Sequence, residues 1–212
     1  IQASKMRHDN IDKTIYYDNA VIKVYNIPIF YIPKLSHPDP SIERRSGFLP
    51  ATLTDTKNLG SGISIPYFLA LDKDKDFTFT NKLYANENPL LMGEYRQAFK
   101  NSNLILDMGY TDGYKNTSRT KTSRDKSHLF SKYVKKFIGK NNSETSFSFQ
   151  TQNISNDKYL KLYRIKSNLV DYNVDVLENS ISFSHSNDDY FLSANTFLYE
   201  TLKDDYNDKY EY

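Results

Sequence analysis

Apolar and polar residues alternate with a period of two along much of the chain, a period typical of half-buried β-strands. The alternation is clear in residues 76–85, 103–111, 146–153 and 179–187. In residues 103–111, one face of the predicted strand carries Leu104, Leu106, Met108 and Tyr110. In the other three segments, Phe, Leu or Ile alternates with polar residues, mostly Thr, Ser and Gln. The pattern predicts antiparallel strands with one apolar and one polar face.

Residues 88–99 fit two periods, that of a short amphipathic helix and that of a strand. Because the neighbouring segments alternate as strands, we predict a strand here as well. Short polar clusters at 72–76, 100–103, 139–142 and 186–189 predict tight turns between strands.

The connections between the predicted strands differ in length. The short turns alternate along the chain with other connections, of which 111–126 and 154–176 are long. An up-and-down sheet places alternate connections at opposite ends, and outer-membrane barrels have short turns at one end and longer loops at the other. The pattern suits such a barrel. It equally suits a soluble antiparallel sandwich or meander, which alternates in the same way.

The first forty residues differ in composition from the rest. Residues 13–35 are an almost continuous run of β-forming residues, apolar on both faces in places. Such a run suits a sheet layer that is covered by something apolar. The segment 36–46 then breaks the pattern with a charge cluster and two X-Pro steps, which favour an extended connector. We predict a domain boundary in this segment.

Composition narrows the class of protein. Hydrophobic residues make up 38% of the chain, below the ~45–50% of ordinary globular domains. Aromatic residues make up 15%, without any Trp, and they pack better on pleated sheets than in a helical bundle. The net charge of +2 argues against a polyanion binder, so we expect no nucleic-acid partner. No apolar run reaches the ~18 residues of a membrane helix, whereas barrel strands leave only a weak hydropathy trace.

The chain contains no cysteine, which excludes disulfides and thiolate metal sites within these residues. It begins at Ile1, without an initiator Met or a visible secretory signal. We therefore expect an internal piece of a longer protein.

No motif predicts catalysis, and we expect a protein that is not an enzyme and has no cofactor or metal site. Residues 72–83 imitate the first half of a calcium loop, but Phe77 and Leu83 replace the required Gly and bidentate Glu. The "HPD" at 37–39 has no second His or Cys nearby. The "GSG" at 60–62 enters a strand rather than a helix that could hold an anion.

The long connection at 111–126 is basic. Its cations are Lys115, Arg119, Lys121, Arg124 and Lys126. Such a run is usually solvated surface, and on a cell-surface loop it also suits the phosphates of a glycolipid.

Residues 20–99 resemble the LPS-assembly protein family of the Gram-negative outer membrane (LptD/OstA). The resemblance depends on a set of short motifs in the family's order and spacing, each weak alone. These are "PIFYIP" (28–33), "HPD" (37–39), "RRSGFLP" (44–50), "GSGISIPYF" (60–68), "DFTFT" (76–80) and "GEYR" (93–96). After residue 110 the similarity is looser, at 155–168 and 177–202.

This resemblance implies an all-β architecture. Residues 1–40 would be the C-terminal end of a periplasmic β-jellyroll. Residues 41–212 would form the first nine or so antiparallel strands of a large, incomplete outer-membrane β-barrel. The implied function is the transport and insertion of lipopolysaccharide (LPS) into the outer leaflet, without covalent chemistry. The implied partners are LPS, an outer-membrane lipoprotein plug (LptE-like) and a periplasmic bridge protein (LptA-like). The implied location is the outer membrane, with the N-terminal part in the periplasm.

The resemblance also assigns roles to several residues. Pro50 and Pro66, in the first and second barrel strands, match the family's prolines at the lateral gate, where each removes a ladder donor and loosens the seam. Pro38 and Pro40 would form a stiff hinge between jellyroll and barrel. Candidate residues for an acyl-chain groove in the jellyroll are Ile22, Val24, Ile27, Ile29 and Tyr31.

Two other functions remain open from the residues alone. A soluble β-sandwich that binds carbohydrate would use the many tyrosines as stacking platforms. An ordinary small porin would lack the jellyroll and the proline-rich connector.

Overall fold

The computed structural model describes residues 2–24, 26–39, 44–112, 125–139, 142–203 and 210–211. The chain divides into two compact units, residues 1–47 and 48–212. Apart from one short helix, the described elements are antiparallel β-strands, which confirms the all-β fold class. No helix in these ranges is long and apolar enough to cross a membrane.

The first unit contains a three-stranded antiparallel sheet in the order β1-β2-β3. Its strands are β1 (Lys5–Asp9), β2 (Thr14–Val24) and β3 (Ile27–Pro38). The run of β-forming residues that the sequence showed therefore folds into β2 and β3. Asn26 turns the chain between them with a φ of 66°, a left-handed conformation that Asn tolerates better than most residues.

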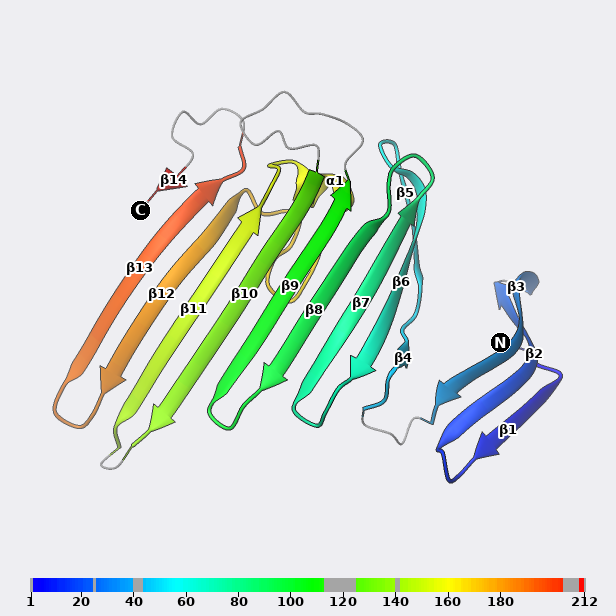
Figure 1. The fold of residues 1–212 in the computed structure, drawn as a ribbon, viewed down its shortest axis with the longest axis horizontal. Helices are drawn as coiled ribbons and strands as arrows, with labels where there is room; N and C mark the ends of the chain where they lie inside the picture. Colours follow the sequence, from blue (N-terminus) through cyan, green and yellow to red (C-terminus); the bar gives the residue numbers. More distant parts are fainter. Residues whose placement is uncertain are drawn as a thin grey trace. The chain divides into compact units, whose positions relative to one another are not determined.

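The second unit is a single antiparallel meander in which each long strand pairs with the next along the chain (Figure 1). The strands are β4 (Gly47–Phe48), β5 (Thr52–Thr56), β6 (Gly60–Ala70), β7 (Lys75–Tyr84), β8 (Leu90–Ala98), β9 (Ser102–Asp112), β10 (Asp125–Ile138), β11 (Glu144–Ile154), β12 (Val176–Ser186), β13 (Phe191–Thr201) and β14 (Tyr210–Glu211). β4 and β5 both pair with β6, so β4 through β13 fill nine positions of the sheet. The prediction of a strand within 88–99 is confirmed by β8.

The ladder sorts the side chains of this sheet into two faces, because residues directly opposite each other point to the same side. On one face, Phe149 lies between Tyr133 and Ile181, and Phe147 lies opposite Phe183. We call the large exposed side chains of this face on β7–β12 the apolar belt. It comprises Phe79, Leu83, Leu91, Met108, Tyr110, Leu129, Phe137, Phe149, Ile181 and Phe183, which are 38–51% exposed.

The opposite face is polar over most of its area. Ser146 and Ser184 join β11 to β12 by a hydrogen bond between their hydroxyls of 2.7 Å. Farther along the sheet, Arg96 donates to Asp76 over 2.8 Å. The alternation predicted from the sequence thus holds across β7 to β12, with apolar side chains on one face and polar ones on the other.

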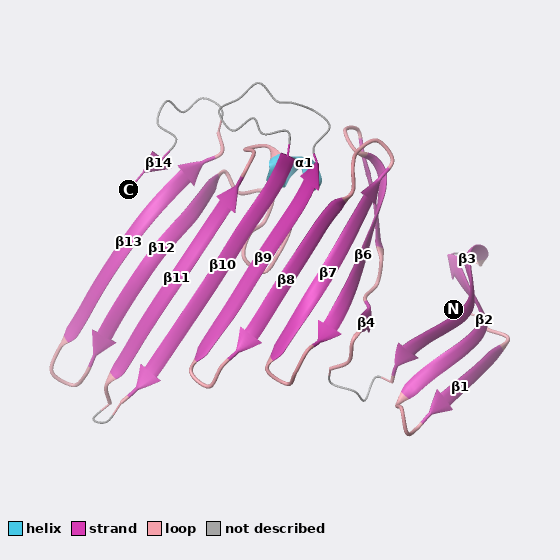
Figure 2. Ribbon diagram, in the orientation of Figure 1, coloured by secondary structure: helices cyan, strands magenta, loops and turns pink. Residues whose placement is uncertain are grey.

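One segment covers part of the polar face. Residues 155–175, which we call the strap, connect β11 to β12 and contain the helix α1 (Tyr159–Tyr163), which lies against the sheet (Figure 2). The strap buries a hydrophobic cluster against the sheet. Its fully or nearly fully buried members are Leu59, Leu90, Phe130, Ile154, Tyr159, Leu160, Tyr163, Ile165, Val170, Leu177 and Leu202. The sequence predicted a long connection here, without a helix.

Leu160 tests whether the strap is part of the folded core. Its side chain is fully buried, so Leu160→Ala should lower the free energy of unfolding by about 2–4 kcal/mol through lost burial and a residual cavity. Leu192, which is 57% exposed on β13, is the control. Leu192→Ala should change the free energy by less than about 1 kcal/mol. Urea unfolding in a neutral detergent, followed by circular dichroism, measures both. Equal effects would contradict the strap's place in the core.

Candidate functional site

The first edge of the large sheet is interrupted at a proline. β4 and β5 occupy this edge, and residues 49–51 between them are outside any strand. Thr52 pairs with Ser64 of β6, and the Leu49 N–H donates to the Pro66 carbonyl oxygen over 2.9 Å. Pro50 therefore lies next to Pro66 in the adjacent strand. Neither proline has a backbone N–H to donate. Two neighbouring strands therefore each lack a hydrogen-bond donor at adjacent positions.

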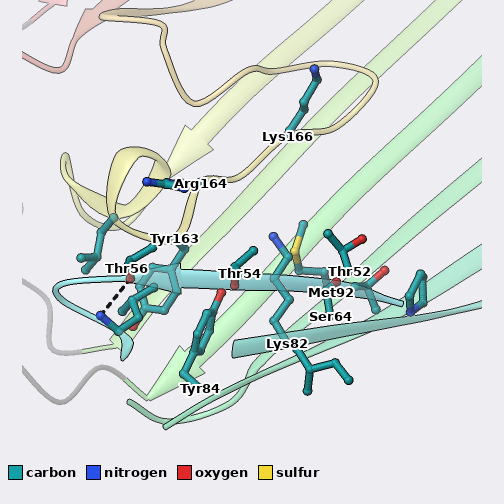
Figure 3. Close-up of a pocket in the computed structure, with 15 residues that line it drawn as sticks. Thr52, Thr54, Thr56, Ser64, Lys82, Tyr84, Met92, Tyr163, Arg164 and Lys166 are labelled. Atoms are coloured by element: carbon teal, nitrogen blue, oxygen red, sulfur yellow. Dashed lines mark hydrogen bonds between the residues drawn. The ribbon is translucent and has the colours of Figure 1, made fainter. Parts of the chain in front are cut away.

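A cavity of about 430 Å³ lies beside this edge, between the polar face of the sheet and the strap (Figure 3). β5 to β8 supply its floor, with Thr52, Thr54 and Thr56 on the edge strand. The strap contributes the residues of its opposite wall, Leu162, Tyr163, Arg164 and Lys166. The cavity thus combines hydroxyl groups, cations and apolar side chains at the proline-interrupted edge.

The pairing of β5, β6 and β7 determines which side chains lie next to one another on the cavity floor. Thr52, Ser64 and Lys82 form one row across β5, β6 and β7. Lys82 extends from β7 toward the strap, whereas Arg164 and Lys166 come from the strap itself, and the charged end of Lys166 points away from the floor (Figure 3). Lys82 is partly buried. The floor therefore presents an ammonium group flanked by hydroxyls.

Tyr84 connects the floor to the strap. Its ring meets that of Tyr163 edge-on, with 5.7 Å between the ring centroids. The absence of a side chain at Gly62 makes this position of Tyr84 available, because a Cβ there would lie 2.8 Å from Tyr84 Cδ1. Burial raises the pKa of the Tyr163 phenol to about 12, so Tyr163 is uncharged at neutral pH.

A buried hydrogen-bond network attaches the strap to the sheet. His128 Nδ1 lies 2.9 Å from the Tyr159 hydroxyl, and His128 Nε2 lies 3.1 Å from Asp107 Oδ1. Burial raises the pKa of Tyr159, so the phenol keeps its proton and can donate it to Nδ1. In the neutral ring the proton then sits on Nε2, which donates to Asp107. The network thus satisfies both ring nitrogens at the base of α1.

Gly109 makes room for this network. It lies opposite His128 in the ladder, and a Cβ at this position would be 2.5 Å from His128 Cε1 and 2.8 Å from the Tyr159 hydroxyl. Farther along the strap, the Asn168 side-chain amide lies 2.9 Å from both carboxylate oxygens of Glu94. Polar contacts such as these hold the strap to the sheet in addition to its hydrophobic core.

Curated proteins are similar to part of the chain, and three of them are described here; no family model matches the chain. The LPS-assembly protein LptD of Psychrobacter cryohalolentis is 32% identical over 83 residues, or 39% of this chain and 8% of that protein. LptD of Francisella tularensis subsp. novicida is 32% identical over 103 residues (46% and 12%). LptD of Pseudomonas aeruginosa is 32% identical over 92 residues (43% and 10%).

Part of the chain is thus similar to the LPS-assembly protein LptD. The matches agree with the resemblance found in residues 20–99. Each covers only about a tenth of the length of the LptD relative. Within the parts of the chain that are described, no group of three or more His, Asp or Glu side chains is placed to hold a metal ion.

The structure brings together two of the residues to which the LptD resemblance assigned a role, Pro50 and Pro66. Pro38 is the last residue of β3, and Pro40 lies outside the described residues.

Of the five groove candidates, Ile22 and Val24 belong to β2, and Ile27, Ile29 and Tyr31 belong to β3. The side chains of the four aliphatic residues lie outside what is described. Tyr31 is exposed and donates its hydroxyl proton to Asn19 Oδ1 over 2.6 Å.

The basic connection is described only at its two ends. Lys115, Arg119, Lys121 and Arg124 lie outside the described residues. The sequence suggested that Lys126 belongs to a solvated loop, and the structure corrects this. Lys126 lies in β10 opposite Thr111, where its side chain is buried.

Gly109→Ala should loosen the strap, because the added Cβ collides with His128 and Tyr159. We expect limited trypsin digestion after Lys161 and Arg164 to become about tenfold faster, since cleavage requires local opening. Gly47→Ala is the matched control, because a Cβ there meets nothing within 4 Å. Peptide mass mapping over time measures the rates. If the two variants are cleaved alike, the network does not hold the strap.

Proposed function

We propose that the chain takes part in LPS transport and in the insertion of LPS into the outer leaflet of the outer membrane. In this proposal, residues 48–212 form the first strands of a large barrel wall. The observation that carries the proposal is the apolar belt, which runs across six consecutive strands and stays 38–51% exposed while the opposite face is polar. Kinship with LptD supports the choice of LPS as the cargo.

The physical argument for a membrane wall combines the ladder with the belt. Hydrocarbon offers no hydrogen bonds, so a spanning sheet must pair its backbone groups between strands. β6 to β12 do so with both neighbours. Transmembrane barrels point apolar side chains to the lipid and polar ones to the interior. An exposed apolar surface of this extent is costly in water but stable against acyl chains.

The proline-interrupted edge supports a lateral gate. At the seam between the first and last strands of a closed barrel, every missing donor weakens the closure. Pro50 and Pro66 remove donors from the first two positions of the sheet, where β5 pairs only with β6 among the described strands. In the proposal this seam parts for LPS, and the cavity behind it lies on the route.

The first unit completes the proposed route. The sheet of β1, β2 and β3 would be the end of a periplasmic jellyroll, with acyl chains passing along Ile22, Val24, Ile27, Ile29 and Tyr31. Pro38 and Pro40 would stiffen the connection to the barrel. The proposed partners are LPS, an LptE-like lipoprotein plug and an LptA-like periplasmic bridge protein.

A pair of cysteine reporters tests the membrane face of the belt, because the chain has no Cys of its own. Phe149→Cys labels the belt, and Ser148→Cys labels the polar face one residue away. With an environment-sensitive fluorophore in phospholipid vesicles, we expect a blue-shifted emission from position 149 and a water-like emission from position 148. A soluble sandwich predicts no vesicle-dependent shift at position 149, and that result would rule out the membrane wall.

Substitution of both gate prolines tests the seam. Pro50→Val combined with Pro66→Val, placed in the complete protein, restores two N–H donors next to each other, each worth about 0.5–1.5 kcal/mol when bonded. We expect slower appearance of newly made LPS at the cell surface, followed by pulse labelling. Pro89→Val, at a residue outside any strand, is the control. Export at the parental rate in the double variant would remove the gating role.

A further inference from the structure

The cavity beside β5 contains a lysine that forms no direct ion pair among the described residues. Within the described residues, Lys82 forms no ion pair and donates no hydrogen bond, although it is partly buried. Asp107 acts on its charge from a distance without forming an ion pair with it; Asp107 Oδ1 meets His128, and Asp107 Oδ2 has no hydrogen-bond partner among the described residues. A partly desolvated ammonium group without a partner is costly. The site therefore favours an anion.

Hydroxyl groups surround this ammonium on the cavity floor. Ser64 lies directly opposite Lys82, and Thr52 follows in the same row on the edge strand. Thr80 precedes Lys82 on the same face of β7, and it also lines the cavity. Hydroxyls and an ammonium group are common ligands of phosphate oxygens, to which they donate hydrogen bonds. The floor therefore offers donor groups that phosphate oxygens can accept from.

Apolar side chains also line the cavity. Met92 extends the floor on β8, and Leu162 and Tyr163 cover it from the strap. β5, which pairs with β6 alone among the described strands, borders the cavity on one side. A ligand that fills this space needs a phosphate for Lys82, a polar body for the hydroxyl row and an apolar part that passes the edge. A phosphorylated glycolipid has all three.

We propose that this cavity holds the phosphorylated sugar headgroup of an anionic glycolipid, with Lys82 contacting the phosphate. The inference rests on the proposed function and adds a binding site for the cargo beside the edge strand. Arg164 and Lys166, which are exposed and line the cavity from the strap, add positive charge beside it. The strap network then has a further role, since it holds the upper wall of this site in place.

Glycolipid binding by the full chain in a neutral maltoside detergent tests the proposal. The probes are bisphosphorylated lipid A, the same lipid without its phosphates, and inorganic phosphate. Microscale thermophoresis gives the dissociation constants. Lys82→Gln removes the charge, and Lys82→Arg keeps it. The matched control is Lys132→Gln, at an exposed lysine of the same face of β10 that forms no ion pair in the described parts of the chain.

The expected result is specific to one charge and one lipid. Lys82→Gln should raise the dissociation constant for the bisphosphorylated lipid by about tenfold or more, as expected for the loss of a charge-assisted bond. Lys82→Arg and Lys132→Gln should leave it close to the parental value. The dephosphorylated lipid should bind more weakly to the parent and should not distinguish the variants.

Several outcomes would overturn the inference. Equal weakening by Lys82→Gln and Lys132→Gln indicates diffuse electrostatic attraction. Equally tight binding of inorganic phosphate indicates a free-anion site, and the absence of lipid binding to the parent leaves no site at all. Circular dichroism and the trypsin pattern of the strap verify the fold of each variant. The cysteine reporters keep the proposed function separate: if position 149 enters lipid while Lys82→Gln binds normally, only the cavity assignment fails.

Discussion

The antiparallel ladder from β4 to β13 is the constraint on which the rest of the second unit depends. Each strand pairs with its neighbour in sequence, so one register passes from strand to strand and sets the direction of every side chain. Because of that register, Phe149 and Ile181 lie together on one face, while Ser148 and Ser182 lie together on the other. A shift of one residue in a single pair would mix the two faces, and neither an apolar belt nor a polar face would remain.

The strap covers part of the polar face and is held there by two kinds of contact. The hydrophobic cluster beneath α1 supplies most of the burial, and the network of His128, Asp107 and Tyr159 supplies direction, because hydrogen bonds fix geometry in a way that apolar contacts do not. Gly109 is the backbone position that accommodates both rings. The result is a covered space on a sheet face that would otherwise be open.

That space lies where the sheet is weakest. The edge strand is divided around Pro50, its neighbour carries Pro66, and the cavity with Lys82 lies directly behind them. A weak ladder and a partly buried unpaired cation each cost stability, and proteins keep such features mainly where function requires them. Their occurrence together is what the proposed passage of an amphiphilic anion at this edge would require.

The sequence by itself determined the strands and their two faces, because alternation with a period of two is a local property of residues such as Leu104, Leu106 and Met108. The sequence also showed the resemblance to LptD. Only the tertiary structure decided what covers the polar face. His128 is 21 residues from Asp107 and 31 from Tyr159, so their contact depends on the register of β9 with β10 and on the return of the strap. The burial of Lys126 in β10 has the same origin. Local patterns carry no information about such distances, because they specify which face a side chain takes but not which distant segment will meet it.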